Sequence, residues 1–217
     1  MANSDCIPQV HICAMRVAEL DPNGVPTPGS NLLTVDSIVE LVATPAITEG
    51  DQIEDKNGCG VVCVNYKGPD TLLRYDITLI VCDQNPYVMA ALGRGTILDD
   101  VVGLETIRGY AFPALGEAST EAVSIEFWAK RIDDGALHAD YPYAWWVLPK
   151  VTDLRHDAMT FSASSNRPAF VGRAFENENW FDGPLNDWPV ESDRAVQWFP
   201  TPALPTVACE PTILPAS

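Results

Sequence analysis

Residues 71–95 read TLLRYDITLIVCDQNPYVMAALGRG, and this stretch indicates a long amphipathic strand followed at once by a short helix. Its side chains alternate between two faces over twelve residues, which is the period of a β-strand. The second face is mixed and begins at Leu72 and Arg74. The first face is the more apolar one, and we expect it to lie in the core through Leu73, Tyr75, Ile77, Leu79 and Val81.

A helix start follows the strand directly. Asn85 is a favoured N-cap residue, and Pro86 suits the first helical position because its fixed φ is helical and its missing N–H is not needed there. Gly93 or Gly95 supplies the expected stop. We therefore predict one short helix packed on a sheet.

The composition limits the classes of function. The 217 residues include 13 basic and 30 acidic side chains, giving a net charge of −17, while 47% of residues are hydrophobic. The hydrophobic content predicts a folded core. Nucleic-acid binding is disfavoured, because it needs basic side chains that contact the phosphates. We find no signal peptide and no apolar run long enough to span a bilayer, so we expect synthesis in a cytoplasm and no membrane anchor.

The remaining periodicity favours strands over helices. Residues 98–106 are ambiguous, and residues 152–159 suggest a turn or two of helix. No regular alternation of strands and helices occurs, so we predict a mainly β fold, an antiparallel β-sandwich or barrel with one flanking short α-helix and extended arms. Further strands are expected at residues 7–16, 33–43, 58–66, 123–131, 143–150, 160–164 and 169–175.

Two segments are rich in turn-forming residues. Residues 21–31, DPNGVPTPGSN, indicate a Pro/Gly arm, and residues 200–217 carry five prolines and indicate an extended C-terminal arm without a core of its own. Residues 176–190 are expected to be loop. We therefore predict one domain over residues 1–199, followed by the arm.

No catalytic or metal-binding motif stands out, and we expect no cofactor. The histidines His11, His138 and His156 fall in no ligand spacing. Cys59 and Cys63 share a strand face about 13 Å apart, at roughly 3.3 Å per residue, which is too far for one zinc ion. We expect the six cysteines to be buried free thiols, and the paired acids to be solvated loop charge.

Three tryptophans, Trp180, Trp188 and Trp198, lie within a loop-rich region. They suit loop anchors or a subunit interface, where tryptophan is enriched. Exposed rings of this kind also stack on sugars, so a carbohydrate-binding module for host adhesion is an alternative.

The order of these features resembles the major tail (tail tube) proteins of long-tailed phages that infect actinobacteria. The resemblance lies in CVNYKGPDTLLRYDITLIVCDQNPYVMAALGRG at residues 63–95, in the preceding Asn57-Gly58, and in GYAFP at residues 109–113.

The resemblance implies two packed sheets flanked by a helix, hexameric rings stacked into a tube in the virion tail, and viral DNA that passes without specific binding. The subunit itself and other tail proteins are the implied partners, with assembly in the host cytoplasm and no enzymatic activity. Acidic charge in a lumen would let DNA slide. Candidate contacts between copies are Pro26, Pro28, Trp180, Trp188 and Trp198. Another tail or head–tail joining protein with the same fold is a further alternative.

Overall fold

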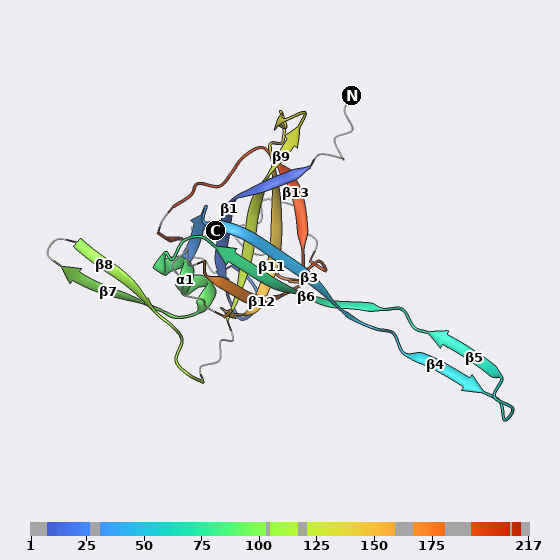
Figure 1. Ribbon diagram of the computed structural model, residues 1–217. Coiled ribbons are helices and arrows are strands. Elements are labelled where there is room, and N and C mark those ends of the chain that lie inside the picture. The colour runs from blue at the N-terminus through green and yellow to red at the C-terminus, as the bar shows by residue number, and fades with distance from the viewer. Residues whose placement is uncertain are drawn as a thin grey trace.

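The protein consists of a β-sheet body from which two hairpin arms project in opposite directions (Figure 1). The computed structural model describes residues 8–26, 31–102, 105–116, 121–158, 167–180, 192–208 and 210–213. The predicted strand at 160–164 therefore lies outside the described residues. No helix among the described residues is both long and apolar enough to cross a membrane.

Strands make up nearly all of the regular structure. The helix is α1 (Pro86–Gly93). The strands are β1 (Gln9–Leu20), β2 (Asn31–Val35), β3 (Ile38–Thr48), β4 (Gln52–Lys56), β5 (Val62–Lys67), β6 (Thr71–Val81), β7 (Thr96–Val102), β8 (Glu105–Ala111), β9 (Ala122–Asp133), β10 (Ala136–Leu137), β11 (Tyr143–His156), β12 (Ala169–Phe175), β13 (Gln197–Thr201) and β14 (Thr212–Ile213).

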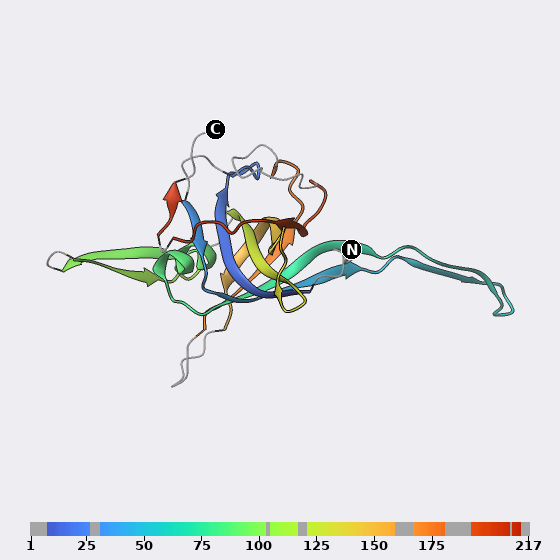
Figure 2. The same ribbon diagram turned by 90° about the horizontal axis from the view of Figure 1, so that it is seen from above.

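Ten strands form one antiparallel sheet in the order β14-β2-β1-β9-β11-β12-β6-β3, with β10 beside β9 and β13 beside β11. Figure 2 shows this sheet curling around the body. The ladder does not close among the described strands, so the sheet is not a closed barrel. The predicted mainly β, antiparallel class with one short helix is confirmed.

The curled sheet encloses the main core. Alternate side chains of β6 face inward, and Ile77, Leu79 and Val81 are buried there against Val88 and Leu92 of α1. A second apolar cluster lies on the other face of β1, β9 and β11, around Trp128, Trp145 and Trp180. The strands β9 and β11 are thus covered on both faces, which explains why residues 143–150 of β11 are apolar on both faces.

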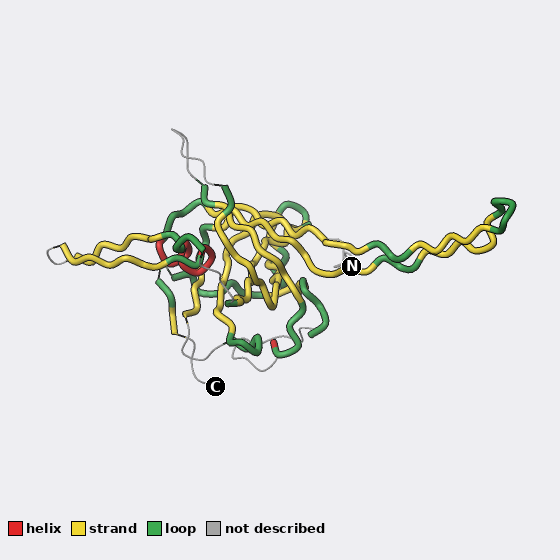
Figure 3. The backbone as a smooth tube through the Cα atoms, turned by 90° about the horizontal axis from the view of Figure 1, so that it is seen from below, coloured by secondary structure: helices red, strands yellow, loops and turns green. Residues whose placement is uncertain are grey.

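The helix forms as its sequence predicts. Asn85 is the N-cap, and its side chain accepts the Tyr87 N–H at 2.9 Å, while Pro86 occupies the first turn. The end differs slightly from expectation, because Arg94 rather than a glycine takes the left-handed conformation, with φ 61°. Figure 3 shows the helix at the root of the hairpin β7–β8.

Several predicted elements change. The predicted helix at 152–159 is wrong, because residues 152–156 continue β11. A register shift lies between Thr152 and Arg155, and Asp153 has φ 54°. This bulge spaces the buried Val151 and Leu154 three residues apart, which imitates a helical period. Of the ambiguous range, residues 98–102 and 105–106 belong to the paired strands β7 and β8. The predicted strand at 33–43 is divided between β2 and β3.

The C-terminal region lies against the sheet over its described part. Strand β13 spans the predicted boundary between the domain and the C-terminal arm at residue 199, and it pairs with β11. Farther on, the Ala208 N–H donates to the Thr34 carbonyl, and β14 pairs with β2. The single domain over 1–199 stays a prediction.

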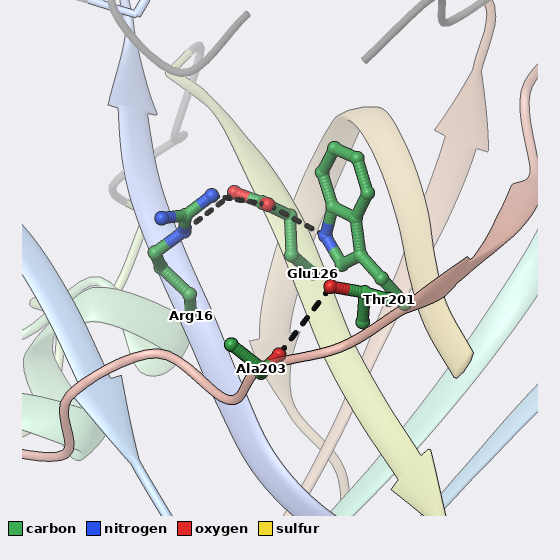
Figure 4. A network of polar contacts seen from close by, with 5 residues as sticks. Arg16, Glu126, Thr201 and Ala203 are labelled. Atoms are coloured by element: carbon green, nitrogen blue, oxygen red, sulfur yellow. Dashed lines mark hydrogen bonds and ion pairs between the residues drawn. The ribbon is translucent and has the colours of Figure 1, made fainter. Parts of the chain in front are cut away.

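A buried carboxylate ties three strands together on the side of the second cluster. Glu126 of β9 is fully buried and accepts two hydrogen bonds from the Arg16 guanidinium, at 2.9 and 2.6 Å. The same carboxylate accepts the Trp145 indole N–H at 2.8 Å (Figure 4). Arg16 also lies over the Trp128 ring, 5.3 Å from its centroid. The ion pair is therefore bidentate and shielded from water.

Replacing Glu126 with alanine is expected to lower the free energy of unfolding by about 3–5 kcal/mol, because it leaves a shielded guanidinium without its counter-charge. Chemical denaturation measures this change. The exposed Asp193→Ala is the control and should stay within about 0.5 kcal/mol of the wild type. An equal, small effect of both substitutions would contradict the structural role of Glu126.

Candidate assembly surfaces

Two hairpins leave the body and carry apolar side chains into solvent. We call residues 45–74 the long arm and residues 96–111 the short arm. The long arm continues the pairing of β3 with β6 outward and ends in the hairpin β4–β5. In Figures 1 and 2 the arms extend from opposite sides of the body.

A tight joint connects the two parts of the long arm. The Gly68 N–H donates to the Asp51 carbonyl at 2.9 Å, and the Gly50 N–H donates to the Asp70 carboxylate at 3.0 Å. A Cβ on Gly50 would lie 2.1 Å from the Gly68 carbonyl oxygen, so only glycine permits this approach of the two strands. The joint sets the direction of β4–β5.

The tip of the long arm is a turn that its own hydrogen bonds close. The Asn57 side-chain oxygen accepts the N–H groups of Cys59 and Val61, both at 3.0 Å. The Asn57 N–H donates in turn to the Val61 carbonyl at 2.9 Å. These bonds hold β4 and β5 in register although no other element covers them.

The hairpin β4–β5 has one apolar face. In its antiparallel register Ile53 lies opposite Tyr66, and Asp55 lies opposite Val64. A register shift follows this pair, and beyond it Val62 lies opposite Lys56. Gln52, Glu54 and Asn65 lie on the other face. Every residue of both strands is exposed, so the apolar face meets only solvent in the single chain.

Exposed apolar side chains continue toward the body. Ile47 lies opposite Leu72 beyond the last buried rung of the sheet, and they are 58% and 48% exposed. Leu73 falls at a register shift and is 53% exposed, which differs from its expected place in the core. Of that expected core face, Tyr75 is half-buried and only Ile77, Leu79 and Val81 are fully buried, because the body ends before the strand does.

The short arm is less clearly two-faced. Leu98 and Ile107 lie on one face and Val101 on the other, each more than half exposed. Arg108 holds the arm near the C-terminal region through Glu210, at 2.7 Å, and also pairs with Asp99 on the neighbouring strand.

The proposed contact residues fall in different places. Pro26 is buried and bridges to Leu20, and Trp180 is 1% exposed within the second cluster. Neither side chain is available to another molecule in this conformation. Trp198 is 45% exposed on β13, stacked on Trp146 with ring centroids 6.1 Å apart. Pro28 and Trp188 lie outside the described residues.

The thiols are not buried as expected. Cys59, Cys63 and Cys82 are exposed, the first two because they sit on the uncovered long arm, and Cys13 is half-buried. Burial raises the pKa of the Cys13 thiol. Cys6 and Cys209 lie outside the described residues. No group of three metal-ligating side chains occurs among the described residues.

A cavity of about 630 Å³ opens between α1, the start of β7 and the end of β11. Arg94 lines it and pairs with Glu121 at 2.9 Å, and burial lowers the pKa of this guanidinium. Glu19, Asp153 and Arg155 also line it, beside apolar walls. Asp153 also pairs with Arg173, and no nucleophile lies beside a base in this lining.

No protein-family model matches the chain, and no curated protein matches its sequence.

Two solved structures are similar in part. One is the sheath-tube complex of an extracellular contractile injection system (PVC) in the extended state, with 13% identity over 76% of this chain and 86% of that chain and a TM-score of 0.30. The other is the sheath/tube terminator of such a system, with 13% identity over 74% and 88% of the two chains and a TM-score of 0.29.

The apolar face of the long arm should contribute little to the stability of the single chain. The triple substitution Ile53→Ser, Val64→Ser and Tyr66→Ser is expected to change the free energy of unfolding by less than about 1 kcal/mol, since these side chains pack on no core. By contrast, Ile77→Ala in the buried part of β6 should cost about 2–5 kcal/mol. Denaturant titration of dilute protein compares them, and a large loss in the triple variant would show that the arm folds back on the body.

Proposed function

We propose that this chain is a structural subunit that assembles with copies of itself, and specifically a tail tube subunit whose stacked, hexameric rings form a conduit for phage DNA. The observation that carries the proposal is the long arm. It presents a large apolar surface that the single chain does not cover, on a framework that its own hydrogen bonds keep extended.

The size of this surface supports a partner. Eight large apolar side chains of the long arm are between 46% and 60% exposed: Ile47, Ile53, Val61, Val62, Val64, Tyr66, Leu72 and Leu73. At roughly 80 Å² each they present about 600 Å². A standard interface takes about 800 Å² from each partner. An isolated two-stranded hairpin is marginal in water, so covering by a second copy would stabilise it.

The reach of the arm fits a neighbour of the same size. From Thr48 to Asn57 the chain extends about 30 Å at 3.3 Å per residue, which is most of the width of a domain of this length. A projecting element that docks on the next copy makes a head-to-tail contact. Head-to-tail contacts form a closed ring or an open-ended stack, depending on their geometry. A tube needs one such contact within each ring and another between rings.

Two further features suit a tube. Strand β3 pairs only with β6 among the described strands, so its other edge is open to a neighbouring copy, except at Pro45, which has no N–H to donate. The net charge of −17 suits a lumen through which DNA passes without sticking. The proposal includes no enzymatic activity and no cofactor.

The carbohydrate-binding alternative loses part of its basis. Trp180 is 1% exposed, so its ring cannot stack on a sugar. Binding on a glycan array that disappears in Trp198→Ala would restore this alternative. Another tail or head–tail joining protein is distinguished by copy number in the particle, because a tube subunit is among the most abundant proteins.

Assembly tests the proposal directly. Concentrated wild-type protein, viewed by electron microscopy, is expected to form rings or tubes. The variant Ile53→Ser, Val64→Ser, Tyr66→Ser should remain monomeric, because it removes the apolar face of β4–β5. The matched control, Gln52→Ser with Asn65→Ser on the opposite face, should assemble as the wild type does.

Either of two results would overturn the proposal. One is the absence of rings and tubes of the wild type under all conditions of concentration and salt. The other is normal assembly of the triple serine variant, which would remove the long arm from the contact.

A further inference from the structure

We propose that His156 is a pH-sensitive latch that fastens the short arm to the body when neutral and loosens it when protonated. The inference concerns the single chain and does not rest on the proposed function. Its basis is a compact cluster at the root of the short arm, made by the ends of three elements.

The latch is a short chain of hydrogen bonds. The Tyr110 hydroxyl, on β8 of the short arm, accepts the Gly95 N–H at 3.0 Å and lies 2.9 Å from His156 Nε2 at the end of β11. These contacts join the arm to the body. The fit is close, because a Cβ on Gly93 would lie 2.1 Å from His156 Nε2 and 2.7 Å from the Tyr110 hydroxyl oxygen.

Aromatic rings surround the histidine. Its ring centroid lies 5.6 Å from that of Tyr110, 4.8 Å from that of Phe112 and 4.8 Å from that of Phe170. Tyr110 and Phe112 come from the arm and its exit, while Phe170 belongs to β12. His156 is half-buried beside these rings and Phe112 is itself 47% exposed, so the rings shield the imidazole in part while its Nδ1 atom is buried.

Protonation would leave a buried donor without an acceptor. The Nδ1 atom of His156 is buried and has no hydrogen-bond partner among the described residues. A neutral ring can carry its one proton on Nε2, toward the Tyr110 oxygen, and leave Nδ1 bare. The imidazolium must carry a proton on Nδ1 as well, and an unpaired buried N–H is costly.

No described charge compensates for this cost. Beside the ring, the phenol of Tyr110 is the titratable group, and burial raises its pKa. Of the cations on the surrounding elements, Arg94 pairs with Glu121, Arg108 with Asp99 and Glu210, and Arg173 with Asp153. Arg155 and Asp157, next to His156 on its own segment, are exposed.

The sign of the pH effect follows from burial. Burial lowers the pKa of His156 below its usual 6.5 in the closed state. In an opened arm the ring is hydrated and its pKa returns toward 6.5, so the open state binds more protons. The latch therefore holds fully above about pH 6.5. It weakens as the pH falls below 6.5 and through the lower pKa that His156 has in the closed state. Each pKa unit by which burial lowers the pKa of His156 corresponds to about a tenfold change in the equilibrium between the closed and open arm.

Hydrogen exchange of the wild-type single chain at pH 7.5 and pH 5 tests the latch. After correction for intrinsic rates, amides of the short arm are expected to lose protection at pH 5 relative to those of β9. In His156→Gln, which keeps a polar side chain but does not titrate there, this relative loss should disappear. The matched control His138→Gln, in a residue outside the cluster, should retain it.

A direct titration keeps the proposal testable if the glutamine variant does not fold. The ring resonances of His156 in the wild type should titrate below pH 6.5. A pKa at or above 6.5, unchanged relative protection of the arm between the two pH values, or the full loss persisting in His156→Gln would overturn the latch.

Discussion

The pairing of β3 with β6 is the constraint on which the rest of the structure depends. Within the body, one face of this pair carries Ile77, Leu79 and Val81 into the core against α1. The same ladder then runs past the edge of the core and becomes the root of the long arm. One run of hydrogen bonds thus fixes both the fold and the direction of its largest uncovered surface.

The sequence predicts the parts whose signals are local. Period-2 alternation identifies β6, and the pair Asn85-Pro86 identifies the start of α1, since caps depend on neighbouring residues only. The bulge in β11 is not predictable in this way, because its extra residue gives Val151 and Leu154 a helical spacing. Alternation likewise cannot tell where a core ends, so Leu73 looks identical in pattern to Ile77 although it is 53% exposed.

The candidate surface is recognised only from the fold. From sequence, residues 49–57 suit an acidic loop or a strand edge, and Cys59 and Cys63 look like core thiols. The register instead shows β4 and β5 forming a hairpin away from the body. The signal that could have found it is a short turn-forming segment, Asn57 to Gly60, between two short β-type runs, and Gly60 takes the left-handed conformation there with φ 80°. For Trp180 the sequence leaves a loop anchor, a subunit interface and sugar stacking open, and its burial in the second apolar cluster is that of a loop anchor.

The central claim is that the long arm lies against another copy, and cross-linking between isotopically distinct copies tests it most directly. Equal amounts of ¹⁵N-labelled and unlabelled protein are mixed, concentrated and treated with a lysine-reactive reagent, and the linked peptides are weighed by mass spectrometry. Lys56 and Lys67 on the arm should form mixed-isotope links to Lys130 or Lys150 of the body. Links from the arm lysines that are confined to a single isotope, in samples that have assembled, would contradict the claim.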